Sequence, residues 1–502
     1  MKNTNGNTVL NSLSFGEGQG EAVLSSPPSE GVGEASNSSP SGRPGGAYKA
    51  TQNACKLCSP LGASVAYKGF EGCVPLIHGS QGCATYIRRY LISHYKEPID
   101  IASSNFTQDS TIFGGDENFK AAVLNIINSY KPQIVGIAST CLSETIGDDV
   151  SLFLHHFLEE YKDIATDFVI ASTPSYQGSH IDGFHEAVSA VVKKFAKPGP
   201  SQEHINLFTN FISTEDIRLI KEITADFGLD SILLPDYSES LDNPVWDTYH
   251  RIPEGGTSIA DVERSGSAKA SIEFGTILNQ GNLAGRVKNK KLSRTGGKYL
   301  QNEMDVPSIE MPMPIGITQT DNFFETLKEL SGNEIPEKYT KQRGRLIDSY
   351  VDAHKYTFGK RAVVYGEEDF VVAMAAFLDE IGIELALVAS GGESGMLEEE
   401  VKKYCPENKD KVVVKEGFDF ESIKEWSLEN KPDILIGHSK GYYIARELGI
   451  PIIRVGFPVH DRIGGQRIKH LAYSGTQELF DKVVNALIEY KQTTSPVGYK
   501  YM

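Results

Sequence analysis

The sequence has few cysteines, no long apolar run and no excess of positive charge. Six cysteines among 502 residues are too few for a fold built on disulfides. No apolar stretch approaches the roughly 18 residues of a membrane-spanning helix, and the first residues lack the apolar segment of a secretory signal. The net charge of −17 argues against nucleic acid and anionic membranes as partners. We therefore expect a cytoplasmic protein whose reduced thiols are available for metal or redox chemistry.

The first 46 residues differ in composition from the rest of the chain. They are rich in Gly, Ser, Pro and Glu and almost lack aromatic residues. Such a segment cannot bury enough apolar surface to offset the entropy lost on ordering. We expect residues 1–46 to form a disordered tail, with a role as a partner-binding arm as the alternative. The remaining length is too great for a single core and predicts about three domains.

From about residue 47, short apolar runs alternate with helical patterns. The runs read as buried strands, and they include QIVGIAST (133–140), DFVIAST (167–173), RAVVYG (361–366), ELALVAS (384–390) and DILIGH (433–438). Repeated β-α-β units predict parallel sheets with helices on both faces. We therefore predict an α/β fold of three doubly wound, Rossmann-like domains, at 47–200, 201–335 and 336–502. Residues 237–330 are less regular, and we place a domain boundary within them.

Three cysteines stand at predicted element ends. Cys58 precedes a helix in which Ser59 suits the N-cap, Pro60 the first turn and Gly69 the stop. Cys83 stands just before another predicted helix, and the positive end of a helix favours a thiolate. Cys141 follows a strand, at the edge of an open α/β sheet where ligands bind.

Ser175 follows the next predicted strand, at the corresponding place. Three thiolates and a hydroxyl on neighbouring element ends could share one iron–sulfur cluster.

The same residue types also have structural interpretations. A free cysteine is often a small buried hydrophobe, and we assign that role to Cys73 and Cys405. Cys55 and Cys58 form a lone CxxC pair without the second pair of a structural zinc site. His78 could be a ligand, although a histidine in a glycine-rich turn more often bonds the backbone. Gly79 and Gly82 allow tight turns and the close approach of a bulky group.

Four longer segments resemble a known family. They are CSPLGASVAYKGFEGCVPLIHGSQGC (58–83), EPIDIASSNFTQDSTIFGGDENF (97–119), STCLSETIGDDV (139–150) and TPSYQGSH (173–180). From about residue 53 to its end, the chain resembles the nitrogenase component 1 family on its beta side. That family has three Rossmann-like domains, so the resemblance implies the same fold as the strand pattern.

The resemblance also implies a site. The spacing of Cys58, Cys83 and Cys141 matches the three cysteines that beta chains give to the P-cluster at the alpha–beta interface. Ser175 matches the serine that can join that cluster. We therefore expect an iron–sulfur cluster, either [4Fe–4S] or P-cluster-like, shared with an alpha-like partner. Some scaffold subunits of the family keep only the cysteine that corresponds to Cys83, so the presence of all three leaves the cluster type open.

Within the family, the chain most resembles the beta-like (NifN-type) subunit of the scaffold on which the iron–molybdenum cofactor is assembled. The segments NACKLCSPLGA (53–63) and TYIRRYLISHYKEPIDIASS (85–104) and the C-terminal region carry this likeness. Catalytic beta chains usually have Tyr-Gly-His where this chain has Ile463-Gly464-Gly465, and they usually end in an acidic tail.

The scaffold interpretation implies an α2β2 heterotetramer that docks the nitrogenase iron protein. Its alpha-like (NifE-type) subunit would hold the iron–molybdenum cofactor precursor, because no segment here resembles the cofactor-binding Cys and His of alpha chains. Two alternatives remain. One is a catalytic nitrogenase beta chain that passes electrons through a P-cluster during dinitrogen reduction. The other is a metal-free structural subunit in which the cysteines only pack.

Overall fold

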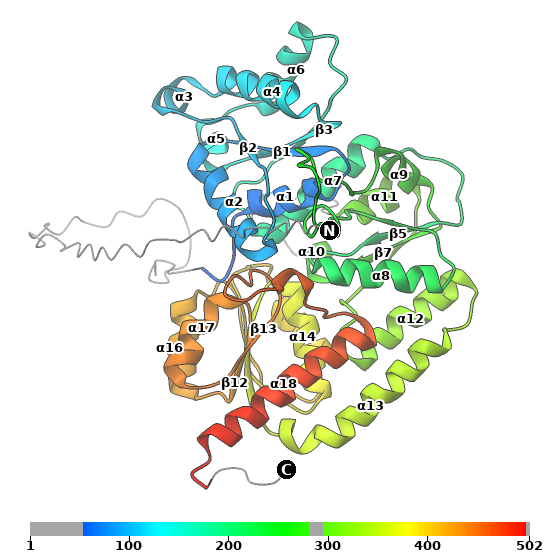
Figure 1. Ribbon diagram of the computed structural model, residues 1–502, viewed down its shortest axis with the longest axis vertical. Helices are drawn as coiled ribbons and strands as arrows, with labels where there is room; N and C mark the ends of the chain where they lie inside the picture. The colour runs from blue at the N-terminus through cyan, green and yellow to red at the C-terminus, as the bar shows by residue number, and fades with distance from the viewer. Residues whose placement is uncertain (1–53, 281–294, 498–502) are drawn as a thin grey trace, which may run out of the picture. The chain divides into compact units, whose positions relative to one another are not determined.

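The computed structural model describes residues 54–280 and 295–497, so the predicted tail at 1–46 lies outside the described residues. Every pairing between named strands is parallel, and the strands form three sheets (Figure 1). Helices follow the strands and cover the sheets, as parallel crossover connections require. The predicted α/β fold with parallel sheets is confirmed.

The first sheet carries the predicted site. Its strand order is β2-β1-β3-β4, with β1 at Cys73–His78, β2 at Ala102–Ser103, β3 at Ile134–Ser139 and β4 at Asp167–Ala171. Its helices are α1 (Ser59–Lys68), α2 (Gln81–Tyr95), α3 (Gln108–Phe113), α4 (Asp116–Tyr130), α5 (Cys141–Ile146), α6 (Val150–Glu160) and α7 (His180–Phe195). All residues of β1 and β3 are buried, because helices cover both faces of the sheet.

Alternate residues of β1 enter different cores. Val74 and Leu76 pack with Phe119 of α4 and Phe157 of α6. The side chains on the other face join the largest core, which contains residues from all three sheets. The first sheet is therefore fixed on one face to the rest of the protein.

Helices α1 and α7 cross without room for side chains at the contact. A Cβ built on Gly62 would lie 1.6 Å from the carbonyl oxygen of His180, and one on Gly183 would lie 1.9 Å from that of Ser59. Glycine is the one residue that permits such an approach of two backbones. This crossing fixes the start of α1, where Cys58 stands, against the segment that follows β4.

The middle sheet has the order β6-β5-β7-β8, with β5 at Ile205–Phe208, β6 at Ser231–Leu233, β7 at Ala270–Phe274 and β8 at Ser308–Met311. Its helices are α8 (Thr214–Asp226), α9 (Ile259–Arg264), α10 (Ile277–Gln280), α11 (Gly296–Met304) and α12 (Ile317–Ser331), with a short 3-10 turn η1 (Ser265–Ser267). The segment 237–330, whose sequence pattern is less regular, contributes β7 and β8, two of the four strands of this sheet.

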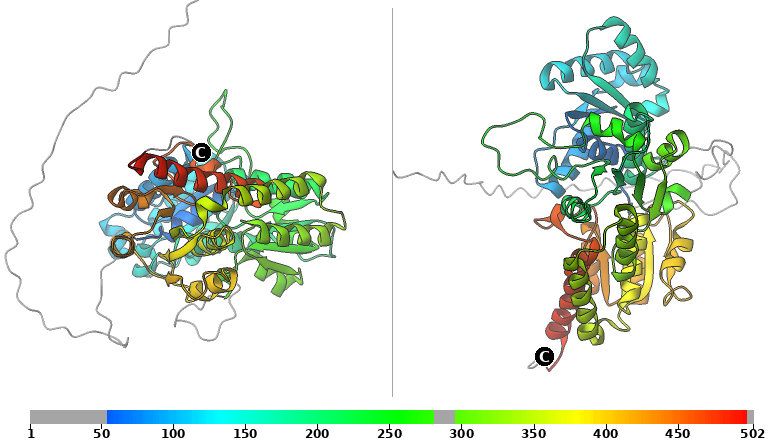
Figure 2. Two further views of the ribbon diagram at one scale, coloured as in Figure 1. Left: turned by 90° about the horizontal axis from the view of Figure 1, so that it is seen from below. Right: turned by 90° about the vertical axis from the view of Figure 1, so that its right-hand side faces the viewer.

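The C-terminal sheet has the order β11-β10-β9-β12-β13, with β9 at Arg361–Gly366, β10 at Glu384–Ser390, β11 at Val413–Lys415, β12 at Ile434–Gly437 and β13 at Ile452–Arg454. Its helices are α13 (Glu337–Thr357), α14 (Glu368–Glu380), α15 (Leu397–Tyr404), α16 (Phe420–Asn430), α17 (Tyr442–Leu448) and α18 (Ala472–Thr494), with 3-10 turns η2 (Ser439–Gly441) and η3 (Gly465–Arg467). Helices α13 and α18 lie side by side (Figure 2).

The described residues, 54–280 and 295–497, belong to one compact unit. The domain boundaries near residues 200 and 335 stay predictions, because the largest core crosses all three sheets. Among the described helices, none combines the length and apolar character that a membrane span needs.

Candidate functional site

The six cysteines divide into two groups by exposure. Cys55, Cys73 and Cys405 are buried, whereas Cys58, Cys83 and Cys141 are exposed. Burial raises the pKa of the Cys55 and Cys73 thiols to about 12, and it also raises the pKa of Cys405. The buried thiols therefore stay protonated at neutral pH. The three accessible thiols are the three that the sequence predicts as ligands.

Cys141 and Ser175 are in direct contact. Cys141 is the first residue of α5, directly after β3, and its Sγ accepts a hydrogen bond from the backbone N–H of Ser175 (3.2 Å). The hydroxyl of Ser175 in turn accepts a hydrogen bond from the backbone N–H of Ser59 (3.1 Å). One short chain of contacts therefore joins the ends of β3 and β4 to the residue beside Cys58.

The start of α1 differs from the prediction. Cys58, rather than Ser59, is the N-cap, and Cys58 makes no side-chain capping bond. Ser59 is the first helical residue, and Ser175 takes the place of a local cap by binding its N–H. The helix does end before Gly69, but with φ of −86° rather than a left-handed turn. A Cβ at Gly69 would lie 2.6 Å from that of Pro235, so close packing explains this glycine.

Cys83 lies within α2 rather than before it. Helix α2 begins at Gln81, with Ser80 as N-cap, so Cys83 is in the first turn. Its Sγ accepts a hydrogen bond from the Ser80 hydroxyl (3.5 Å). Gly82 is also helical, and the idea that it makes a sharp turn is wrong. A Cβ on Gly82 would meet no atom nearer than 3.8 Å, so open space lies beside it.

A tight contact joins the end of β1 to the end of β3. The hydroxyl of Thr140 donates a hydrogen bond to the carbonyl of His78 (2.9 Å). A Cβ on Gly79 would lie 2.4 Å from this hydroxyl oxygen. Gly79 therefore lets the loop that leads to Cys83 pass closely over the loop that leads to Cys141.

His78 has a structural role in the described site. Its Nε2 lies 3.0 Å from a carboxylate oxygen of Asp148, and its ring packs edge-on against Phe106 and Phe119. The side chain is fully buried. The expectation that His78 bonds the backbone through its ring is wrong, because Asp148 takes that place. The burial of the ring also separates it from the exposed thiols.

Two residues near Cys58 were not predicted from the sequence. Lys440 of η2 and Tyr90 of α2 both interact electrostatically with Cys58. Lys440 lies 386 residues from Ala54, to whose carbonyl it donates a hydrogen bond (3.3 Å). Its position directly after the β12 run DILIGH, at the ligand-binding edge of a parallel sheet, is the signal that could have found it.

The loops and helix starts at the edge of the first sheet carry three accessible sulfurs, which makes soft metal ligation the chemistry available there. Among the described residues, no group of three or more His, Cys, Asp or Glu is arranged to hold a single metal ion. Soft thiolate ligands select zinc, copper(I) or iron–sulfur clusters. The sulfurs of Cys83 and Cys141 already accept hydrogen bonds from Ser80 and Ser175. A thiolate that is bound to a cluster also accepts hydrogen bonds, so these contacts could persist when a cluster is present.

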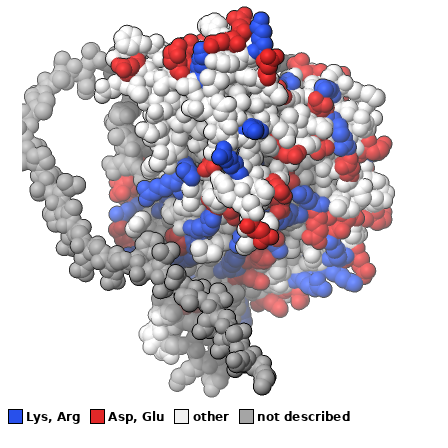
Figure 3. Space-filling model, turned by 45° about the horizontal axis from the view of Figure 1, so that its top comes forward, with Lys and Arg blue, Asp and Glu red and all other residues white. Residues whose placement is uncertain are grey.

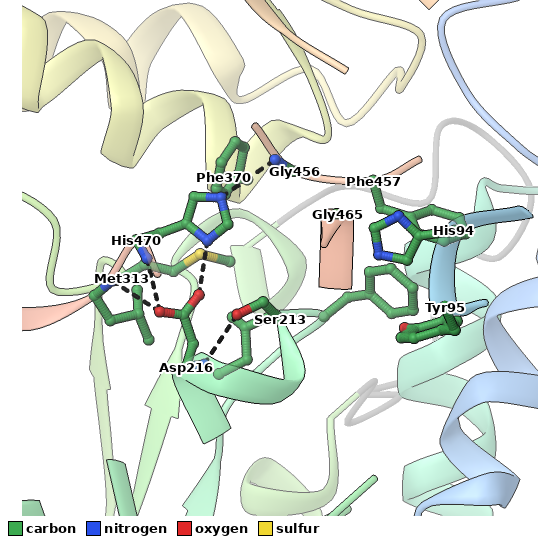
Figure 4. Close-up of a pocket in the computed structure, with 13 residues that line it drawn as sticks. His94, Tyr95, Ser213, Asp216, Met313, Phe370, Gly456, Phe457, Gly465 and His470 are labelled. Atoms are coloured by element: carbon green, nitrogen blue, oxygen red, sulfur yellow. Dashed lines mark hydrogen bonds and ion pairs between the residues drawn. The ribbon is translucent and has the colours of Figure 1, made fainter. Parts of the chain in front are cut away.

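A separate buried cavity lies where the three sheets meet (Figure 4). It holds about 20 Å³ of free space and is lined mainly by apolar side chains, including Phe211 and Phe457. His470 accepts a hydrogen bond from the N–H of Gly456 (3.4 Å), so its other ring nitrogen donates to Asp216 (2.7 Å). The Asp216 carboxylate also accepts hydrogen bonds from the backbone N–H groups of His470 and Leu471, so this buried pair is satisfied within the protein.

His94 connects this cavity to the thiol-bearing helix. It stands in the last turn of α2, and its Nδ1 accepts a hydrogen bond from the N–H of Val459 (3.0 Å). Burial is the main cause that lowers the pKa of His94 to about 3. The folded protein therefore keeps this ring neutral, and protonation would abolish the acceptor for Val459.

We expect His94→Asn to weaken the acid sensitivity of the fold. Asparagine keeps an acceptor near Val459 but does not titrate. The free energy contributed by neutral His94 is fully present above pH 6.5 and is lost as pH falls toward 3. The stability difference between wild type and H94N should thus shrink by about 1.4 kcal/mol per pH unit below pH 6.5. Urea unfolding at pH 8, 6 and 5 measures it, and parallel pH profiles would contradict the burial argument.

Comparison with known proteins agrees with the fold. The model of the family described as nitrogenase component 1 type oxidoreductase matches residues 58–488. The chain is 34% identical over 443 residues to the nitrogenase molybdenum-iron protein beta chain of Clostridium pasteurianum, covering 87% of this chain and 93% of that one. It is also 34% identical over 458 residues to the nitrogenase vanadium-iron protein beta chain of Trichormus variabilis, covering 86% and 94%.

A solved structure gives the same result in three dimensions. A chain of "Nitrogenase Cp1 at pH 6.5" superimposes with a TM-score of 0.85 at 32% identity, covering 92% of this chain and 98% of that chain. A chain of "Nitrogenase Cp1 at pH 5" has a TM-score of 0.62 at 14% identity, a likeness of fold alone. From the family match, the sequence relatives and the shared fold, we conclude that this chain belongs to the nitrogenase component 1 type oxidoreductase family.

Proposed function

We propose that this chain is a beta-like subunit that supplies Cys58, Cys83 and Cys141 to an iron–sulfur cluster shared with an alpha-like partner. One observation carries the proposal: of six cysteines, these three are exposed, and each lies at the N-cap or in the first turn of a helix at the edge of the first sheet. Soft thiolates on separate elements suit a cluster of several irons. When bound, such a cluster stores and passes electrons.

The chain's own residues would prepare this site in three ways. Cys58 is the N-cap of α1 and Cys83 is in the first turn of α2, so both thiols lie at the positive end of a helix dipole. The Ser175 N–H holds the sulfur of Cys141, and the Ser175 hydroxyl lies at the start of α1. Ser175 is thus placed to join the ligand set, provided that Ser59 exchanges its hydrogen bond for another.

The surroundings of the thiols support a protein partner. Large apolar side chains are exposed on or beside these elements: Tyr86 of α2 (56%), Ile112 and Phe113 of α3 (73% and 85%) and Tyr176 beside Ser175 (53%). Helix α3 packs beside α5, which begins at Cys141. Figure 3 shows acidic and basic side chains interspersed on one face of the protein. A partner that buries these side chains would also shield the thiolates from oxidation.

We further propose that the complex is the assembly scaffold for the iron–molybdenum cofactor. The support lies in residues 463–465, where catalytic beta chains usually have Tyr-Gly-His. Gly464 has φ of +79°, and a Cβ on Gly465 would lie 2.7 Å from the carbonyl of Val459. A histidine at position 465 would require this loop to take another path. In this proposal the NifE-type alpha-like subunit holds the cofactor precursor, and the iron protein docks on the α2β2 complex.

A catalytic beta chain is the second candidate. The specific observation in its favour is the naming of the relatives, which are molybdenum-iron and vanadium-iron protein beta chains. Both candidates require the same thiolates and the same kind of partner. They differ in whether the complex turns over substrate or delivers a cofactor precursor.

We expect an anaerobically purified complex with the alpha-like partner to be an iron-containing heterotetramer. With the iron protein and ATP, it should reduce no dinitrogen, but it should restore activity to a catalytic protein that lacks its cofactor. Size-exclusion chromatography measures the assembly state, iron analysis measures the cluster content, and the two assays distinguish a scaffold from a catalytic complex. Dinitrogen reduction by the complex itself would establish the catalytic candidate. A stable complex without iron would support the metal-free structural subunit and overturn both.

A further inference from the structure

Lys440 brings a positive charge from the C-terminal sheet to the thiol edge of the first sheet. It is half-buried in η2, directly after β12. Its Nζ donates a hydrogen bond to the carbonyl of Ala54 and lies 5.8 Å from the centre of the Tyr90 ring. In the described part of the chain, Lys440 makes no ion pair with a carboxylate. A half-buried cation without a counter-charge is costly unless a ligand supplies one.

The neighbours of Lys440 show where that negative charge belongs. Its ammonium interacts electrostatically with the sulfurs of Cys55 and Cys58. Burial raises the pKa of Cys55 to about 12, and burial together with the Tyr86 hydroxyl raises the pKa of Tyr90 to about 12. Both groups are therefore neutral at physiological pH. Cys58 is the exposed group of the three, and it is the one proposed as a ligand.

We propose that Lys440 tunes the reduction potential of the cluster by holding a fixed positive charge beside Cys58. The inference rests on the proposed cluster site. In the redox step, a one-electron reductant adds one electron to the cluster, and no bond or proton is transferred. A nearby positive charge stabilises the more negative, reduced cluster, so it raises the midpoint potential.

The position of Lys440 suits this role better than a purely structural one. Its two contacts, a carbonyl oxygen and the face of a ring, fix the ammonium without neutralising its charge. Tyr90 lies on α2, two helical turns beyond Cys83, and its hydroxyl meets that of Tyr86 (3.5 Å). The charge is thus held against the helix that contains Cys83, and its carbonyl contact at Ala54 precedes Cys58 in the chain.

The test compares Lys440→Gln, Lys440→Arg and Lys415→Gln in the complete complex with its partner. Lys415 is an exposed lysine at the end of the edge strand β11, so K415Q removes a charge from the same sheet at another place. Anaerobic redox titration followed by visible absorbance gives the midpoint potential, and iron analysis gives the cluster content. We expect K440Q to keep its iron and to raise the oxidised-to-reduced ratio at a fixed potential about tenfold, which corresponds to about 59 mV for a one-electron couple.

The outcomes separate this inference from the proposed function. K440R should stay within about threefold of wild type, and K415Q should be unchanged. Iron in every protein with an unchanged potential in K440Q would overturn the role of Lys440 alone. Wild-type complex without iron would overturn the cluster site and this inference together. If K440Q loses iron, restoration of the iron by K440R supports a role of the charge, and failure to restore it contradicts that role.

Discussion

Replacing Cys83 by alanine is expected to remove most of the bound iron and leave the fold intact. Cys83 is exposed, and its sulfur contacts only the Ser80 hydroxyl among the described hydrogen bonds. Truncating it opens no cavity, so the stability should change by no more than about 0.5 kcal/mol. The cluster, in contrast, would lose one of three ligands from this subunit. Iron per complex and visible absorbance, both measured without oxygen, should fall together while the thermal unfolding midpoint stays constant.

Cys405→Ala is the matched control for this experiment. Cys405 is buried at the C-terminal end of α15, beside the C-terminal sheet rather than the first sheet. Its truncation leaves a small cavity and should cost about 1 kcal/mol, with iron unchanged. C83A should therefore lose iron and keep its stability, whereas C405A should keep its iron and lose stability. Equal iron in wild type and C83A would mean that Cys83 is no ligand, and the proposed site would fail.

Replacing Gly62 by alanine is expected to disrupt the native packing of the first sheet. The added Cβ would lie 1.6 Å from the carbonyl oxygen of His180, a backbone atom that cannot rotate away. Helix α1 would have to separate from α7 along the crossing that contains Gly62 and Gly183. We expect a loss of more than about 4 kcal/mol, among the largest effects of a point mutation. Urea unfolding of the complex measures it.

Gly344→Ala tests whether the effect depends on the crossing. Gly344 is exposed within α13, and a Cβ there would meet no atom within 4 Å. Alanine favours a helix more than glycine does, so G344A should stabilise the protein by about 0.5–1 kcal/mol. The same replacement of glycine by alanine should thus lower the free energy of unfolding at position 62 and raise it at position 344. A stable G62A variant that retains its iron would show that α1 can tilt away from α7 without moving Cys58.

The strands that the sequence predicted correctly are those with unbroken apolar runs. Residues 361–366 and 384–390 match β9 and β10 to the residue, because helices cover both faces of a parallel sheet and every position favours an apolar side chain. Strand β7 escaped prediction because its run ASIEF contains Glu273. This carboxyl group is buried and accepts a hydrogen bond from Ser308. Burial raises the pKa of Glu273, which no local pattern reveals.

The candidate site could be predicted only where its residues mark local ends of elements. Cys141 and Ser175 follow strands, so the strand pattern and the family resemblance both pointed to them. The bond from Ser59 to Ser175 spans 116 residues, and the one from Lys440 to Ala54 spans 386. Such contacts depend on how the sheets pack, and a single sequence contains no periodic signal for them. The helix start at Gln81 was missed because Gly82 reads as a turn residue.

The first sheet and its helices come from one continuous stretch of chain, from α1 to the end of α7 at Phe195. During synthesis this stretch leaves the ribosome early, and domains generally fold in that order. Lys440 and the rest of the C-terminal sheet follow on the order of ten seconds later or more at usual elongation rates. All three exposed thiols are therefore present on the nascent chain before Lys440 is added. Under the proposed function these thiols are open to oxidation in that interval, so translation speed and the supply of the partner subunit would together limit how much protein receives a cluster.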